Sequence, residues 1–223
     1  MRSRASTGFT HRPYSLAMGF YGEQVLPRII NKLGDTKAVR EVRDETCKGL
    51  HGDVIEVGFG SGLSVPHLPS TVSGVWAVEP SETAMKLAQS RVDASPIPVK
   101  QAGLDGEKLE ESDDRFDAAL SFMTLCTIPD ANAALGELRR VLKPGAEFHF
   151  AEHGRSPDEK VARNQDRFNP LENMFVGGCN LNREIDALIT GAGFEITRLR
   201  NFYLKGGGPK TVSYMYVGAA RNP

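Results

Sequence analysis

The residues of this chain best suited to chemistry are three alternating glycines, Gly58, Gly60 and Gly62, which follow the run Val54–Val57. That run is apolar apart from Glu56, and it predicts a buried strand of a parallel sheet. Glycines directly after such a strand allow a sharp turn and leave room for a ligand against the main chain. The segment therefore predicts the first strand–loop–helix crossover of a doubly wound sheet, where nucleotides bind. The alternative is a tight turn without a ligand.

A carboxylate at the end of the next expected strand fits the same interpretation. Glu79 lies 17 residues after Gly62, where a strand expected at 72–78 ends. A carboxylate at that position can accept two hydrogen bonds from a ribose diol. The alternative is that Glu79 caps the following helix, but Ser81 is already well placed for that role.

His153 is the candidate catalytic side chain. It follows a strand expected at 146–151, so it is expected to project into the cleft. An imidazole there can act as a general base or orient a substrate, and the alternative is a hydrogen-bonded structural histidine. His149, Glu152 and His153 also suggest a metal site. Because metal sites need three or four convergent ligands and His149 would be buried in mid-strand, we expect no metal.

Composition and cysteine positions limit the function further. The net charge of −1 gives no bulk electrostatic reason to bind nucleic acid. No apolar run is long enough to span a bilayer and no signal-peptide pattern is present, so we expect no stable membrane insertion. Cys47, Cys126 and Cys179 are far apart in the sequence and form no CxxC pair. This predicts free thiols in the cytoplasm rather than disulfides or a zinc site, with Cys179 a small packed thiol.

The elements that position these residues alternate along a chain of 223 residues. Residues 1–52 are expected to form an arm (1–19) and two helices, at 20–33 and 37–50. These helices close over the cleft as a lid or simply pack on the sheet. Residues 53–223 are expected to form one folded unit, in which 155–180 shows no long helical pattern. Its remaining strands and helices are expected at 97–101, 116–121, 131–142, 183–192, 194–203 and 213–219.

Six segments carry a family resemblance, in this order: Glu56–Leu63, Val78–Ser81, Thr124–Asp130, Arg140–Gly145, Glu152–Asp158 and Gly178–Arg183. Together they resemble the class I S-adenosylmethionine (SAM) methyltransferases of the type 11 group. More closely, they resemble bacterial relatives of the methyltransferase-like family whose animal members methylate thiols. The apolar N-terminal anchor of those animal members is not seen here. The resemblance implies a Rossmann-like, mostly parallel seven-stranded sheet with helices on both faces and a C-terminal antiparallel hairpin.

The resemblance also implies SAM as cofactor, with S-adenosylhomocysteine as its product. The acceptor that it implies is a small molecule, for which a thiol is one candidate. The alternatives are O-methylation of a phenol, quinone or lipid-like acceptor, and a SAM-binding protein without catalysis. An NAD-type oxidoreductase is a further alternative. The spacing of the third glycine and the C-terminal antiparallel hairpin argue against it.

The resemblance implies separate roles for three acids: Glu56 helps anchor the methionyl ammonium group, Glu79 binds the ribose, and Asp105 binds the adenine. An Asp-Gly pair is also an ordinary turn. Phe59 stands where relatives have a small residue or cysteine, and it is expected to reshape the wall near the methionyl group. The other expected cofactor contacts are Tyr21, Gly58, Gly60, Gly62, Leu63, Pro80, Ser81, Gly106, Phe122 and Met123.

Overall fold

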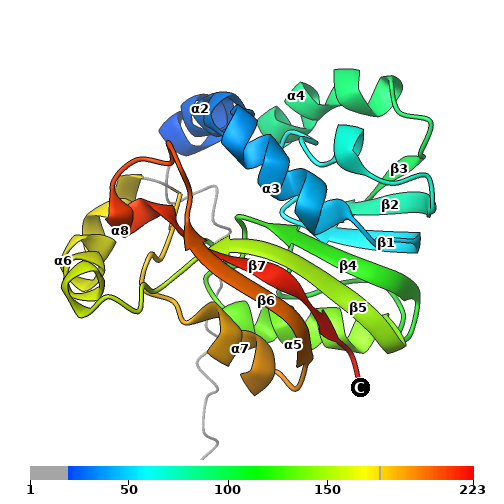
Figure 1. Cartoon of the computed structure of the whole chain (residues 1–223). Helices are drawn as coiled ribbons and strands as arrows, with labels where there is room; N and C mark the ends of the chain where they lie inside the picture. The colour runs from blue at the N-terminus through cyan, green and yellow to red at the C-terminus, as the bar shows by residue number, and fades with distance from the viewer. Residues whose placement is uncertain (1–19, 176) are drawn as a thin grey trace, which may run out of the picture.

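The computed structural model describes residues 20–175 and 177–223, so the arm expected at 1–19 lies outside the described residues. The described part contains one seven-stranded sheet in the order β3-β2-β1-β4-β5-β7-β6 (Figure 1). The strands are β1 (Gly52–Val57), β2 (Val72–Val78), β3 (Val99–Gly103), β4 (Phe116–Phe122), β5 (Leu142–His153), β6 (Glu195–Tyr203) and β7 (Tyr214–Arg221). The helices are η1 (Tyr21–Val25), α2 (Leu26–Leu33), α3 (Lys37–Cys47), η2 (Val65–His67), α4 (Glu82–Asp93), α5 (Ala131–Val141), α6 (Glu159–Phe175), α7 (Ile185–Gly191) and α8 (Lys210–Ser213).

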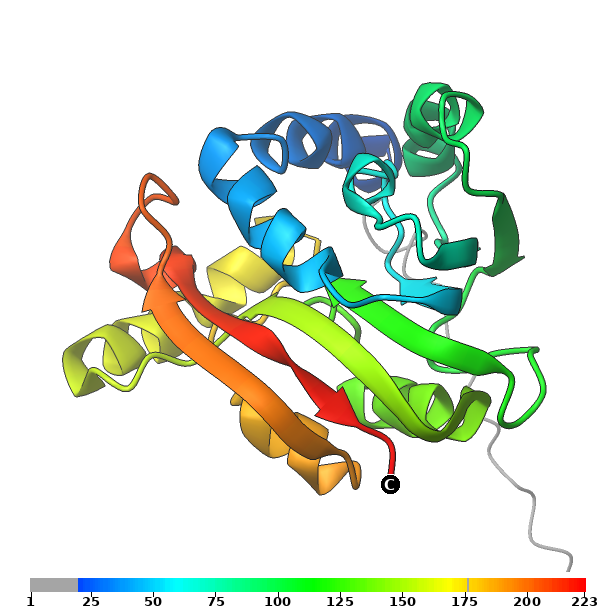
Figure 2. The ribbon, with the colours of Figure 1, turned by 45° about the vertical axis from the view of Figure 1, so that its right-hand side comes forward.

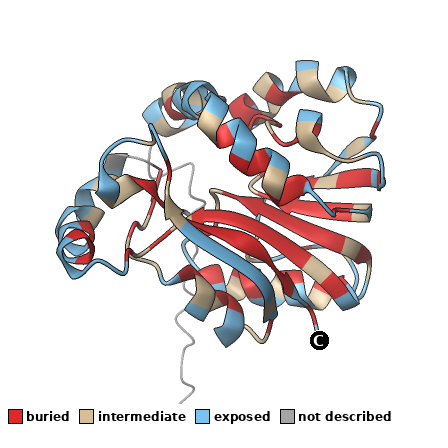
Figure 3. Cartoon of the chain, viewed as in Figure 1, coloured by how far each residue is buried: buried red, intermediate tan, exposed pale blue. Residues whose placement is uncertain are grey.

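The sheet has the predicted mixed topology. Strands β3, β2, β1, β4 and β5 pair in parallel, and β7 pairs antiparallel with both β5 and β6. Helices α3 and α4 cover one face, and α5 and α7 cover the other (Figures 1 and 2). The central strands are therefore buried on both sides (Figure 3), which is why β1 and β4 read as nearly continuous apolar runs. All parallel strands end at the same edge, where ligands bind in this architecture.

Local signals placed the helix ends correctly. The Ser81 hydroxyl accepts a hydrogen bond from the Ala84 amide (3.2 Å) and caps α4. Asp130 caps α5 in the same way through the Ala133 amide (3.0 Å). Gly34 ends α2, in agreement with the helix expected at 20–33. These caps supply partners for main-chain groups that a helix end would otherwise leave unpaired.

Two elements differ most from the prediction, whereas α3 ends three residues earlier than expected and β3 is shifted by two residues. Helix α6 occupies a segment for which no long helix was expected. The residues that it buries include Val161, Ala162 and Gln165, whereas Leu171 and Met174 are exposed, so its sequence lacks a clear apolar stripe. Strand β5 begins four residues earlier than expected, at Leu142, where it pairs with Phe116 of β4.

The apolar face predicted for the first helix is mostly uncovered. Leu26 is buried, but Ile29, Ile30 and Leu33 are 41%, 50% and 64% exposed, so no other described residue covers them fully. None of the helices within the described residues has the length and apolar character needed to cross a membrane.

Candidate active site

The glycine loop after β1 is built for close approach on two sides. Gly58 and Gly60 have φ values of +75° and +58°, which L side chains rarely adopt. A Cβ atom on Gly58 would lie 2.0 Å from Oγ1 of Thr124, so only glycine lets the loops after β1 and β4 touch. A Cβ atom on Gly60 would meet nothing closer than 3.8 Å. Gly60 therefore leaves its main chain open to a ligand.

Glu79 braces this loop from the end of β2. Its Oε2 accepts the Gly60 amide and its Oε1 accepts the Ser81 amide, both at 2.8 Å. The side chain is buried, and burial raises the pKa of its carboxyl group. Each carboxylate oxygen accepts more than one hydrogen bond, so Glu79 can hold the loop and still receive a diol.

Glu56 places an unpartnered carboxylate oxygen beneath the loop. Its Oε1 accepts the Ser64 hydroxyl (2.7 Å), whereas Oε2 has no hydrogen-bond partner among the described residues. Burial raises the pKa of Glu56 to about 7, and the Ser64 hydrogen bond and the charge of Arg43 act in the opposite direction. A buried acceptor without a partner is costly, so this oxygen fits a cationic N–H donor on a ligand. The ammonium group of SAM is such a donor.

The loops after β3 and β4 complete the rim. A Cβ atom on Gly106 would lie 2.8 Å from Val57, so the loop after β3 packs on the end of β1. Asp105 is exposed, and its Oδ1 accepts the Glu107 amide (2.8 Å), which is the local-turn alternative. After β4, the buried Phe122 lies 4.0 Å below the Arg43 guanidinium. Met123 follows with φ +55°, a conformation that is strained for a residue other than glycine.

The remaining expected cofactor residues are spread over the rim and the core. The Phe59 side chain is 2% exposed and packs in the core against Gly62, and its effect on the wall near the methionyl group stays a prediction. Leu63 is partly buried near Gly34 of α2, and Pro80 is exposed. Tyr21 lies on η1 and is 40% exposed.

Glu152 has a role that the sequence did not reveal. It is fully buried, and burial raises the pKa of its carboxyl group. Oε1 accepts the Ser121 hydroxyl (2.7 Å) and the Thr124 amide (3.1 Å), and Oε2 accepts the Cys126 amide (3.4 Å). Glu152 thus anchors the loop after β4. The metal set suggested by the sequence does not form, because His149 instead donates from Nδ1 to the Thr46 carbonyl (2.8 Å).

Two of the cysteines that are far apart in the sequence meet in the fold. The Sγ atoms of Cys126 and Cys179 and a ring nitrogen of His153 all lie within 4.8 Å of one another. Both cysteines are buried and His153 is half-buried at the end of β5. Hydrogen bonds from Cys126 and His153 lower the pKa of the Cys179 thiol. The fold therefore brings Cys126 and Cys179, which no sequence pattern pairs, next to His153.

An open α/β sheet of this order, with its glycine loop and the buried Glu79 at adjacent strand ends, defines a Rossmann-like fold of the methyltransferase type. The family model described as "Methyltransferase domain" matches residues 55–150. A SAM-dependent methyltransferase of Thermotoga maritima has the same fold, with a TM-score of 0.64 and 20% identity over 92% of this chain and 100% of that one.

Two curated relatives differ in how much of the chain they match. Thiol S-methyltransferase TMT1B of Mus musculus is 26% identical over 196 residues, which is 85% of this chain and 78% of the relative. Phosphatidylethanolamine N-methyltransferase of Cereibacter sphaeroides is 29% identical over 104 residues, which is 46% of this chain. The matched part spans about half of that relative's length (51%). The chain thus has the fold of the class I methyltransferases, and the domain match and the similarity to these relatives support a SAM-dependent enzyme of that class.

Proposed function

We propose that this protein transfers the methyl group of SAM to the sulfur of a small apolar thiol. The observation that carries the proposal is the extent of the match to the thiol S-methyltransferase. That match spans 85% of the chain, whereas the match to the phosphatidylethanolamine enzyme spans 46%. A match of 85% extends well beyond the domain at 55–150, into the parts of the chain that supply the acceptor side of the site.

The cofactor supplies a methyl group on a sulfonium, which is electrophilic without activation by the protein. Glu56 is proposed to receive the ammonium group, Glu79 the ribose and the loop containing Asp105 the adenine. The Gly58–Thr124 contact then sets the β4 loop against the glycine loop. The main contribution of the protein is alignment of the two reactants in a cleft from which water is excluded.

The acceptor side needs little base strength for a thiol. A thiol is already partly ionised near neutral pH, so an imidazole at His153 is sufficient to take or orient the proton. O-methylation of a phenol or quinol is the second candidate, and it is supported by the similarity to a ubiquinone biosynthesis O-methyltransferase of Rhizobium rhizogenes, which is 24% identical over 121 residues. An oxygen acceptor would depend more strongly on His153.

We further propose a cytoplasmic, reducing location and no nucleic-acid partner. All three cysteines are free, and the net charge is −1.

The test is a paired acceptor screen with purified protein and SAM. Benzyl mercaptan and thiophenol are compared with benzyl alcohol, phenol and a reduced quinone, and products are read by mass. Methylation of thiols, lost in Glu79→Ala, is the expected result. Methylation of the quinol alone would replace the thiol with an oxygen acceptor. Binding of SAM without turnover of any member would overturn the enzyme assignment for these acceptor classes.

A further inference from the structure

Three side chains with metal-ligating atoms converge at the acceptor side of the site. Cys126 comes from the loop after β4, His153 from the end of β5, and Cys179 from the segment before α7. Their ligand atoms all lie within 4.8 Å of one another. In a tetrahedral site with metal–sulfur bonds near 2.3 Å, ligand atoms are about 3.8 Å apart. Small side-chain rotations therefore bring all three within bonding distance of one ion.

The chemistry of this set selects the kind of ion. Two thiols and an imidazole are soft to borderline ligands, which favour zinc over magnesium or calcium. Both cysteines are buried, and a buried thiolate without a counter-charge is costly. A divalent cation would balance two thiolates. Arg183 and Glu172 are the other charged groups that interact with Cys179.

The segments that carry Cys126 and Cys179 are held together by hydrogen bonds to main-chain carbonyls, which do not involve the thiols themselves. The Cys126 carbonyl accepts the Asn180 amide (2.7 Å) and the Asn180 side chain (3.1 Å), so the residue after Cys179 is tied to Cys126. Arg183 donates from Nη1 to the Leu125 carbonyl and to the Ile128 carbonyl (2.7 Å). Together these contacts clamp the segment 178–183 onto the β4 loop.

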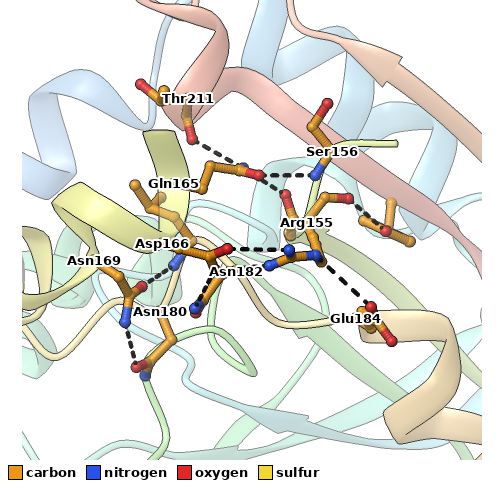
Figure 4. A network of polar contacts seen from close by, with 12 residues as sticks. Arg155, Ser156, Gln165, Asp166, Asn169, Asn180, Asn182, Glu184 and Thr211 are labelled. Carbon is orange, nitrogen blue, oxygen red and sulfur yellow. Dashed lines mark hydrogen bonds and ion pairs between the residues drawn. The ribbon is translucent and has the colours of Figure 1, made fainter. Parts of the chain in front are cut away.

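Helix α6 supports the same segment from the outside (Figure 4). Asn169 accepts the Leu181 amide (2.8 Å), and Asp166 accepts the Asn182 side chain (3.0 Å) and pairs with Arg155 (2.7 Å). A ligand set fixed by surrounding hydrogen bonds binds a metal with little reorganisation. The helix that was not expected from the sequence thus holds the segment that carries Cys179.

Three protein ligands leave one tetrahedral position open. Closed structural zinc sites use four protein ligands, whereas catalytic sites keep a position for water or substrate. Thr124, two residues before Cys126, touches the glycine loop, so the cluster lies next to the cofactor side of the cleft. His153 is the partly exposed member of the set.

The geometry points to a thiophilic divalent metal site formed by Cys126, His153 and Cys179, with its open position binding the sulfur of the acceptor. The binding of the acceptor sulfur rests on the proposed function, whereas the metal site itself does not. A thiol bound there loses its proton to solvent and becomes a metal-bound thiolate, so in the metal-bound protein His153 acts as a ligand and not as the base. Its sulfur then forms the bond to the methyl carbon, and the pair of the broken carbon–sulfonium bond stays on the sulfur of S-adenosylhomocysteine.

The test uses Co²⁺ as a spectroscopic probe on the full-length protein stripped of metal with a chelator. Thiolate ligation gives a sulfur-to-cobalt charge-transfer band in the near ultraviolet. We expect one Co²⁺ per chain with this band, displaced by Zn²⁺. Cys126→Ala and Cys179→Ala should each lose about half of the band. Cys47→Ala, which removes the buried thiol outside the cluster, should keep all of it.

Far-ultraviolet circular dichroism shows whether each cysteine variant folds. If either does not, His153→Ala serves as the test instead, because it keeps both thiols. It should weaken Co²⁺ binding at least tenfold while keeping the charge-transfer band. Benzyl mercaptan should add intensity to the band of the unaltered protein, and benzyl alcohol should not.

No Co²⁺ band, or a band that is unchanged in both folded cysteine variants, would overturn the metal site. A band that benzyl mercaptan leaves unchanged would overturn the acceptor position alone. None of these readings uses SAM or turnover, so their failure is separate from failure of the proposed methyl transfer.

Discussion

The proposed cofactor side, around Glu56 and Glu79, and the proposed acceptor side, around Glu152 and Arg183, are held together over different distances along the chain. On the cofactor side, Glu56 bonds Ser64 across 8 residues and Glu79 bonds Gly60 across 19. On the acceptor side, Glu152 reaches the Cys126 amide across 26 residues, and Arg183 reaches the Leu125 carbonyl across 58. The cofactor side is thus formed largely by adjacent motifs, whereas the acceptor side exists only when distant segments have packed. Substitutions should therefore be able to damage one side and spare the other.

The largest expected effect is a difference in stability between alanine variants at two glycines of the same loop. Gly58→Ala should lower the free energy of unfolding by about 3 kcal/mol, because the added carbon collides with Thr124 at a positive φ. Gly60→Ala should cost only about 1 kcal/mol, from backbone strain, because the space beside it is open. Urea unfolding measures both values, and SAM binding to Gly60→Ala should be at least tenfold weaker. Equal stability of the two variants would contradict the contact between the two loops.

A smaller effect is expected from the charge of Glu56. Its pKa in the folded protein is about 7, above the ordinary value of 4.5, so the folded state binds more protons between these pH values. Its contribution to the free energy of unfolding therefore falls as pH rises from 4.5 to 7. A ligand cation favours the ionised form, so SAM affinity should rise as the pH passes through 7, by about tenfold between pH 6 and pH 8.

Calorimetric titration of SAM across this pH range tests the assignment. Glu56→Gln keeps the size of the side chain and removes its titration, so its affinity should be lower at pH 8 and lose this increase. The same pH slope in both proteins would remove Glu56 from ammonium recognition.

The smallest expected effect is confined to the acceptor side. Arg183→Lys removes the fork that binds the Leu125, Ile128 and Pro129 carbonyls, and should cost about 1 kcal/mol of stability. The KM for the acceptor should rise severalfold, while the Kd for SAM stays within about twofold. Arg163→Lys, at an exposed position of α6, is the matched control. A parallel loss of SAM affinity would show that the two sides do not separate.

The same contrast in contact range explains what the sequence could predict. The positions of most strands and the Ser81 helix cap follow from periodicity and short-range signals, whereas the mixed seven-stranded topology was implied by the family resemblance. The convergence of Glu56, Glu79 and the glycines follows from the rule that parallel strands end at one edge. Their roles toward SAM remain predictions, as do those of Tyr21, Asp105 and His153.

The acceptor side could not be predicted because its signals are not local. Cys126 and Cys179 are brought together by Asn180 and Arg183, which bond main-chain carbonyls that have no sequence signature. In the sequence, Glu152 suggested only a metal ligand, and its role as a loop anchor was not visible because its partners include backbone amides. Helix α6 was missed because polar side chains such as Gln165 fill part of its buried face.

The contact of Thr124 with Gly58 has a consequence for how the binding of one substrate affects the affinity for the other. Any shift of the glycine loop on binding the cofactor is passed to the strand-end loop that carries Met123 in a strained conformation. The two binding equilibria are then thermodynamically coupled. Reciprocity requires the cofactor to change acceptor affinity by the same factor as the acceptor changes cofactor affinity, and such factors are typically about 5 to 150. One pair of touching loops thereby makes each substrate an effector of the other.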